Sequence, residues 1–152
     1  MRPFFRSPLA AHLALALALT TSAQVAMAEP HKAIQADAEQ YQDEALKLLE
    51  RLVNIDSGSG YVPGLTKVSD IAIDELKKLG ATIEQVPNTP EASHHVIATL
   101  KGTGKAKILL MAHMDTVFKE GSAAQRPFHI KDGRAYGPGV MDDKGGIVAA
   151  IY

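Results

Sequence analysis

The spacing of hydrophobic positions changes several times along this chain, and each spacing predicts a different element. Leucine and valine recur at helical intervals from about residue 43 onward, which predicts an amphipathic helix that ends near Asn54. The same interval returns over residues 66–79, and Gly80 follows at the usual position of a helix stop. Residues 29–40 are polar and predict a loose lead-in. The first part of the fold is therefore expected to be helical.

Beyond these helices the pattern becomes extended. Short apolar runs at residues 82–86 and 96–101 predict strands. Residues 108–112 are almost continuously apolar, which is typical of a strand buried on both faces. Residues 128–136 contain a central Asp-Gly pair and predict a tight hairpin. The middle of the chain is therefore expected to supply a sheet.

The last residues, 146–152, begin another apolar helix. Helices and strands in this order predict an α/β fold, in which helices flank a central mixed or parallel sheet. Ligands of such sheets bind at the carboxyl ends of the strands. His113 and Asp115 directly follow the most apolar predicted strand. A functional site is therefore expected around these two residues.

The first 28 residues have the three-part pattern of a secretory signal peptide. Arg2 and Arg6 make a positive start, residues 9–19 form an apolar stretch, and an Ala-Met-Ala cleavage pattern ends at Ala28. The alternative is a membrane anchor, but this stretch is shorter than the roughly 20 residues that span a bilayer. We therefore expect a signal peptide over residues 1–28 and a periplasmic or secreted protein without membrane attachment after cleavage.

Composition limits the remaining chemistry. The 16 basic and 17 acidic side chains give a net charge of −1 without a basic patch, which argues against a nucleic-acid partner. There is no cysteine, so the chain has neither a thiolate nucleophile nor a thiolate metal ligand. Any metal ion must be held by histidine, aspartate and glutamate.

His113 and Asp115 form the first candidate site. On an extended segment, side chains two residues apart leave from the same face. A neutral imidazole is a good zinc ligand, and a carboxylate at its other ring nitrogen fixes the tautomer. The pattern therefore predicts His113 as a ligand that Asp115 orients. The alternative is a structural histidine–aspartate hydrogen bond at the end of a strand.

The second candidate is the pair Asp142 and Asp143, in a glycine-rich turn. Glycines on both sides permit unusual backbone angles, so one carboxylate can turn inward and bridge two metal ions. The alternative is a solvated loop or a helix N-terminus, where the helix dipole favours negative charge. Two such motifs in one α/β chain support each other as parts of one metal site.

The long forms of both motifs carry a family resemblance. MAHMDTV at residues 111–117 and YGPGVMDDKGG at residues 136–146 are similar to the zinc-dependent exopeptidases related to glutamate carboxypeptidase. That family also includes aminoacylases, tripeptidases and desuccinylases, and the secreted glutamate carboxypeptidase type is the most similar. The resemblance implies a metal-dependent exopeptidase that acts on small peptides or N-acyl amino acids, including release of a C-terminal glutamate.

The resemblance also implies roles for single residues. His113 would ligate one of two zinc ions, Asp142 would bridge both, and Asp115 would act in catalysis by orienting His113. The Asp142–Asp143 peptide would be cis. A water molecule activated by zinc would be the nucleophile.

Other parts of the family pattern are not in this chain. The glutamate pair that supplies the general base, a further acidic ligand, a second histidine and the lid and dimerisation domain would all follow Tyr152. Residues 29–152 are therefore expected to be the N-terminal portion of a catalytic zinc-peptidase domain, inactive alone, with a homodimer expected only for the full-length enzyme. The alternative is an exported non-catalytic or pseudogene fragment that keeps the fold.

Overall fold

The structure is a computed structural model that describes residues 31–88 and 93–152. The predicted signal peptide, residues 1–28, lies outside the described residues. By its internal contacts the chain divides into two units, Met1–Gln35 and Ala36–Tyr152. The fold described below is that of the second unit.

Both predicted helices are present, and both begin earlier than predicted. Helix α2 spans Lys32–Val53 and helix α3 spans Val62–Lys78. The predicted loose lead-in is wrong for residues 32–40, which are helical. These residues include alanine, glutamine and glutamate, which favour a helix even where no apolar face is buried. In α3, Pro63 lies in the first turn, where its missing N–H group costs nothing.

The strands form two hairpins. Strand β1 (Thr82–Pro87) pairs antiparallel with β2 (His94–Thr99), and β3 (His129–Lys131) pairs antiparallel with β4 (Arg134–Tyr136). The Asp-Gly pair between β3 and β4 has positive φ angles at both residues, 51° and 71°, as a tight hairpin turn requires. These elements confirm the predicted strands apart from small shifts at their ends.

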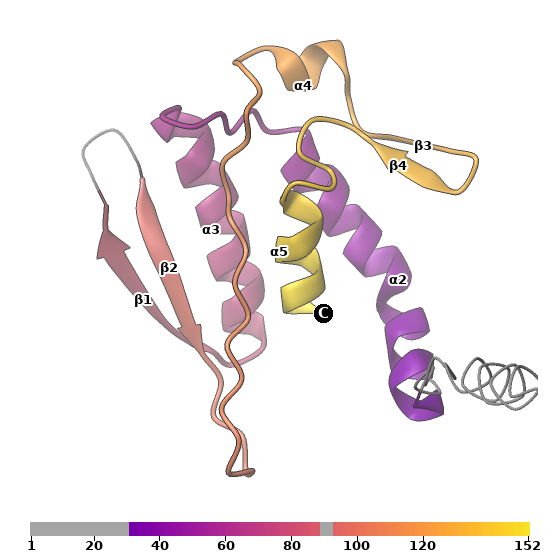
Figure 1. Cartoon of the computed structure of the whole chain (residues 1–152), viewed down its shortest axis with the longest axis vertical. Helices are drawn as coiled ribbons and strands as arrows, with labels where there is room; N and C mark the ends of the chain where they lie inside the picture. Colours follow the sequence, from indigo (N-terminus) through magenta and orange to yellow (C-terminus); the bar gives the residue numbers. More distant parts are fainter. Residues whose placement is uncertain (1–30, 89–92) are drawn as a thin grey trace, which may run out of the picture. The chain divides into compact units, whose positions relative to one another are not determined.

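The prediction of a buried strand over residues 108–112 is wrong. This segment runs extended past α3 and α5 without pairing in a ladder (Figure 1). The four large apolar side chains of residues 108–111 are 64–85% exposed. A strand exists only where a second backbone satisfies its N–H and C=O groups, and no described segment pairs with these residues.

The α/β class predicted from the sequence is confirmed. Within the described residues its sheets are the two antiparallel hairpins, and parallel pairing is confined to a single bridge between Gly58 and Thr116. Two further helices complete the unit: α4 (Ser122–Gln125), and α5 (Lys144–Ile151), which follows the second motif. Figure 1 shows α5 between α2 and α3, with the β1–β2 hairpin beyond α3.

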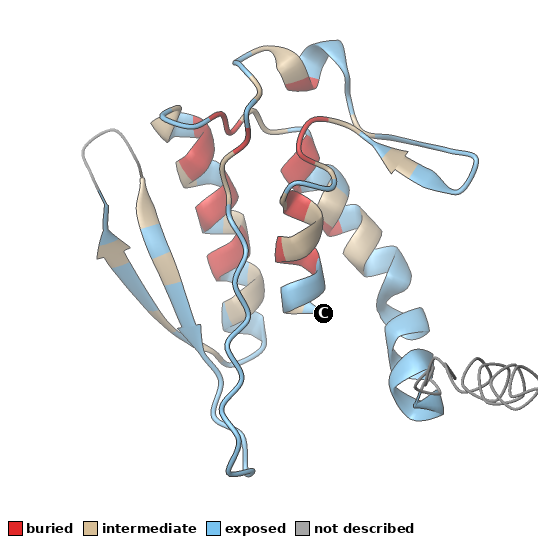
Figure 2. Ribbon diagram, viewed as in Figure 1, coloured by how far each residue is buried: buried red, intermediate tan, exposed pale blue. Residues whose placement is uncertain are grey.

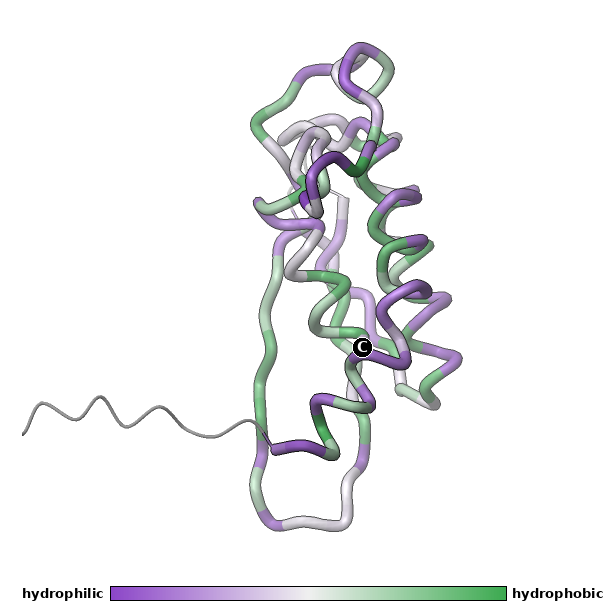
Figure 3. The backbone as a smooth tube through the Cα atoms, turned by 90° about the vertical axis from the view of Figure 1, so that its right-hand side faces the viewer, coloured by the Kyte–Doolittle hydropathy of each residue, from purple (hydrophilic) through white to green (hydrophobic). Residues whose placement is uncertain are grey.

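One hydrophobic core joins three helices that lie far apart in the sequence. Figure 2 shows the buried positions in α3, in α5 and in the C-terminal part of α2, and Figure 3 shows hydrophobic and hydrophilic residues alternating along the helices. The core residues are Leu48, Leu52, Val68, Ala72, Ile147 and Val148. This core holds the N-terminal end of α5, and with it the second motif, close to the end of α2.

None of the helices in residues 31–88 and 93–152 is long and apolar enough to cross a membrane.

An ion-pair cluster between α2 and α3 predicts a pH-dependent contribution to stability. Glu75 accepts from Lys78 at 2.7 Å and from Arg51 of α2 at 2.9 Å, and its side chain is 11% exposed. The Lys78 hydrogen bond, with the Arg51 hydrogen bond adding to it, holds the pKa of Glu75 below 4.5 although burial opposes this. We expect Glu75→Gln to lower the unfolding free energy at pH 7 by about 0.5–1 kcal/mol, measured by urea denaturation.

The sign follows from the lowered pKa. The contribution of Glu75 is present above its unfolded pKa and is lost as the pH falls through the folded value. The difference between wild type and variant should therefore shrink progressively below pH 4.5. Asp70→Asn, at an exposed position on the same helix, should show no such trend. A Glu75→Gln difference that stays constant from neutral to acid pH would contradict the ion-pair explanation.

Candidate metal centre

His113 lies on the extended segment with an acceptor at each ring nitrogen. Its Nδ1 is 2.9 Å from the backbone oxygen of Asp115 and 3.2 Å from the carboxylate Oδ1 of the same residue. Its Nε2 is 2.8 Å from Oδ1 of Asp142. The predicted convergence of His113 and Asp115 is therefore present. The additional contact to the Asp115 carbonyl was not predicted.

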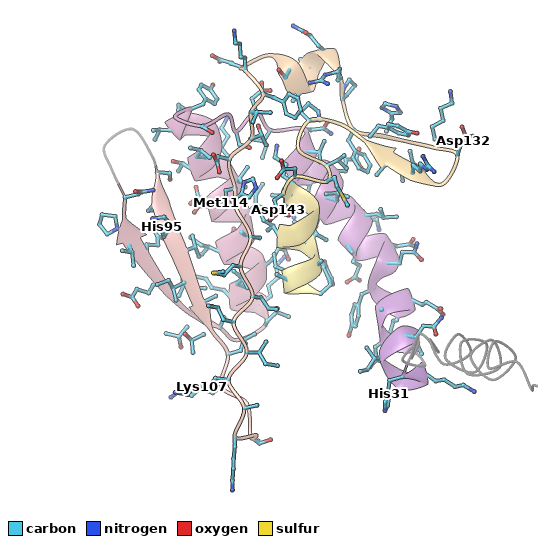
Figure 4. The ribbon with its side chains drawn as sticks, in the orientation of Figure 1. His31, His95, Lys107, Met114, Asp132 and Asp143 are labelled. Carbon is cyan, nitrogen blue, oxygen red and sulfur yellow. The ribbon has the colours of Figure 1, made fainter. Side chains whose placement is uncertain are left out.

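The two carboxylates of the second motif have different partners. The Asp142–Asp143 peptide is cis, as the family resemblance implies. Asp142 faces the ring of His113, whereas Asp143 Oδ2 accepts a hydrogen bond of 3.3 Å from the backbone N–H of His113. Figure 4 shows Asp143 at the start of α5, beside the segment that carries Met114. Asp143 stands at the N-cap of α5 but makes no side-chain cap hydrogen bond to that helix.

The buried side chain of Lys144 ties this turn to the loop after α2. Its side chain is almost fully buried, at 1% exposure, and its Nζ donates to the backbone oxygen of Ile55 at 2.6 Å. Burial lowers the pKa of Lys144 to about 8, and the charge of Asp56 partly opposes the shift. The turn that holds Asp142 is thus tied to the loop after α2. Sequence reasoning missed Lys144, whose signal is a lone lysine between two aspartates and two glycines at the first position of an apolar helix.

Two glycines allow the same turn to lie against the core. Gly137 has φ +151° and Gly139 has φ +72°, both in the region that favours glycine. A Cβ at Gly137 would collide with Cγ1 of Val53, at the end of α2, and a Cβ at Gly139 would collide with Cγ2 of Thr116. The close approach of this turn to both neighbours therefore requires glycine, and it brings Asp142 within reach of His113.

The contacts around His113 and Asp115 favour the charged form of each residue. Partial burial acts to lower the pKa of His113, but hydrogen bonds to Asp142 and to the Asp115 backbone outweigh it, so the net pKa is raised above 6.5. A hydrogen bond from Ser59, followed by the charge of His113, lowers the pKa of Asp115 against the effect of burial. The carboxylates of Asp115 and Asp142, which would attract a metal cation, also favour the protonated form of His113. A cation and a proton therefore compete for His113.

The donor chemistry of this cluster fits zinc in part. Imidazole nitrogen and carboxylate oxygen are zinc ligands, and an acceptor behind the distal ring nitrogen is the usual support for a ligating histidine. His113 and Asp142 supply two such donors, whereas zinc takes at least three protein groups. Nowhere in the described part of the chain do three histidine or acidic side chains gather closely enough to hold an ion. The described residues therefore fit as part of a zinc site.

The site borders an open space in the same unit. His113 and Asp115 line a cavity of about 580 Å³, together with His94 of β2 and apolar residues of α3 and α5. Asp142 is not among its lining residues. The Asp115 side of His113 thus faces this cavity.

Comparisons with known proteins agree with the motifs. Residues 109–152, which hold both motifs, match the family model described as Peptidase family M20/M25/M40. Carboxypeptidase G2 of Pseudomonas sp. (strain RS-16) is 37% identical over 154 residues, which cover 100% of this chain and 36% of that protein. Acetylornithine deacetylase of Vibrio campbellii (strain ATCC BAA-1116) is 36% identical over 114 residues, which cover 70% of this chain and 29% of that protein.

A Peptidase M20 domain-containing protein of Schizosaccharomyces pombe is 30% identical over 112 residues, which cover 72% of this chain and 26% of that protein. The chain thus spans about a third of the length of the curated relatives it matches, or less. The resemblance predicted from the motifs is confirmed: the chain is similar, as a partial piece, to zinc exopeptidases of the glutamate carboxypeptidase type. Its mixture of helices and small sheets is consistent with part of an M20 peptidase domain.

Proposed function

We propose that this chain is the N-terminal portion of the catalytic domain of an exported, zinc-dependent exopeptidase. The observation that carries the proposal is the position of His113, whose Nε2 lies 2.8 Å from Asp142 Oδ1 while its Nδ1 faces Asp115. The two residues predicted to bind metal and the residue predicted to orient one of them therefore meet at one place. Their roles as ligands and orienting group remain predictions.

The chain's own residues divide the work. When bound, zinc supplies a Lewis acid and lowers the pKa of a coordinated water toward about 7. With Asp115 accepting the proton of His113 Nδ1, Nε2 is the nitrogen that would bind a cation, in place of its hydrogen bond to Asp142 Oδ1. Asp142 offers a carboxylate with one oxygen already facing that nitrogen. Asp143 keeps the backbone of residue 113 in place.

The substrate class in this proposal is a small peptide or an N-acyl amino acid, including one with a C-terminal glutamate. The names of the relatives, a carboxypeptidase and a deacetylase, support this class. The proposal includes two zinc ions per complete site, export to the periplasm or beyond through residues 1–28, and a homodimer for the full-length enzyme. It includes neither a nucleic-acid partner nor a membrane partner after cleavage.

Metal removal tests the proposal. The protein as it is naturally produced should release amino acids from peptidyl or acyl substrates, and a chelator should abolish this release until zinc is restored. His113→Ala should abolish zinc binding measured by calorimetry. His129→Ala should not, because His129 lies exposed on β3 and stacks on Tyr136.

Hydrolysis that continues at the same rate in the chelator would overturn the zinc mechanism. Absence of any hydrolysis, together with intact folding, would favour the alternative of an exported non-catalytic protein. The expectation that these 152 residues alone are inactive rests on their two ligands and is tested by the same assay on the isolated chain.

A further inference from the structure

The loop between α2 and α3 is joined directly to the segment that carries the metal-site residues. The backbone N–H of Thr116 donates to the oxygen of Ser57, and the N–H of Ser59 donates to the oxygen of Thr116, each at 2.9 Å. These two bonds form the parallel bridge between Gly58 and Thr116. The backbone alone therefore holds Ser59 next to Asp115.

The contact between these two segments is too close for a side chain at its centre. A Cβ at Gly58 would collide with the backbone oxygen of Phe118. Thr116 is itself buried at this point. The backbone position of Ser59 is thus set by the buried Gly58 before it and by its hydrogen bond to Thr116.

From this position the hydroxyl of Ser59 contacts the carboxylate of Asp115. Ser59 Oγ donates to Asp115 Oδ2 at 2.6 Å, and the other carboxylate oxygen, Oδ1, lies 3.2 Å from His113 Nδ1. Each oxygen of the carboxylate therefore has its own partner. With Oδ2 held by Ser59, rotation of the carboxylate about its Cβ–Cγ bond is restricted and Oδ1 stays directed at the imidazole.

We propose that Ser59 is a positioning residue of the metal site, which acts through the carboxylate of Asp115 to hold the His113 ring in its ligand orientation. The inference rests on the function proposed above and extends it by one residue that the motifs do not contain. Outer hydrogen-bond partners of metal ligands commonly set metal affinity in this way. The hydroxyl contacts the carboxylate, and the carboxylate contacts His113 Nδ1 at 3.2 Å beside the backbone oxygen of Asp115, which lies 2.9 Å from the same nitrogen.

The test measures zinc affinity of the protein as it is naturally produced. Ser59→Ala should weaken zinc binding about 10-fold, at the lower end of the usual range because these side chains are partly exposed to water. Ser57→Ala is the matched control, because it lies in the same loop and its buried Oγ has no hydrogen-bond partner in the described residues. It should leave zinc affinity unchanged.

A second pair of variants isolates the hydroxyl even if alanine disturbs the loop. Threonine and valine have nearly the same shape, and only threonine keeps the donor. Ser59→Thr should bind zinc nearly as well as wild type, and Ser59→Val should show the loss. Equal affinities for the two variants would overturn the proposal.

A double-mutant cycle shows whether Ser59 acts through Asp115. In an Asp115→Ala background, Ser59→Ala should change zinc affinity less than about 2-fold, because its partner is already gone. An undiminished loss in that background would overturn the proposal. His113→Ala separates the two failures. If His113→Ala abolishes zinc binding while Ser59→Ala has no effect, the positioning role of Ser59 is wrong and the metal site stands. If His113→Ala has no effect on zinc binding, the proposed metal site is wrong as well.

Discussion

Replacing Asp142 with alanine should weaken zinc binding more than about 100-fold and remove hydrolytic activity with it. Changes in the outer shell of a metal site already cost about 10–100-fold, and Asp142 is proposed as a direct ligand. Its side chain is 81% exposed, so its removal takes little packing from the fold. The variant should therefore keep its circular dichroism spectrum and lose its metal, as measured by calorimetry and by an assay of amino-acid release.

Two further variants define the scale of this effect. The zinc affinity of Asp115→Ala should lie between those of wild type and Asp142→Ala, about 10–100-fold below wild type. The reason is that Asp115 is proposed to contact the ligand His113 rather than the metal. Asp74→Ala, at an exposed position on α3, should have no effect. Small and equal effects from Asp142→Ala and Asp115→Ala would show that the glycine-rich turn is only structural.

Gly137→Ala should lower the free energy of unfolding by about 3 kcal/mol, because overpacking and backbone strain each cost about 1–3 kcal/mol. Gly137 has φ +151°, and an added Cβ would collide with Cγ1 of Val53, which is fully buried at the end of α2. Neither the turn nor the helix can move aside without opening the core. Urea denaturation of both proteins measures the difference.

Other glycines provide matched controls for this prediction. Gly133 has φ +71° but open space around its Cβ position, so Gly133→Ala should cost only the backbone strain, about 1 kcal/mol. Gly102 has open space and no left-handed φ, so Gly102→Ala should be nearly neutral. If Gly137→Ala is as mild as Gly102→Ala, the turn does not pack against α2 as described.

Local signals predicted the elements that depend on short stretches of sequence. The apolar spacing of α3 and the glycine after it identified this helix, and the Asp-Gly pair identified the β3–β4 hairpin. The start of α2 was missed because its first turns bury no apolar face, and periodicity detects only buried faces. The strand predicted over residues 108–112 was wrong because apolar composition does not supply the second backbone that a ladder requires.

The amino-acid sequence alone identified which side chains carry the candidate chemistry: His113, Asp115 and Asp142 stand out through residue type, spacing and family resemblance. Only the tertiary structure decided which other groups hold them. Ser59 meets Asp115 across 56 residues of chain, and Lys144 meets Ile55 across 89. Contacts of this range leave no periodic pattern in the sequence. The first contact forms because the backbone bridge between Gly58 and Thr116 places the two segments side by side, and the second because the shared core of α2, α3 and α5 holds the start of α5 near the end of α2.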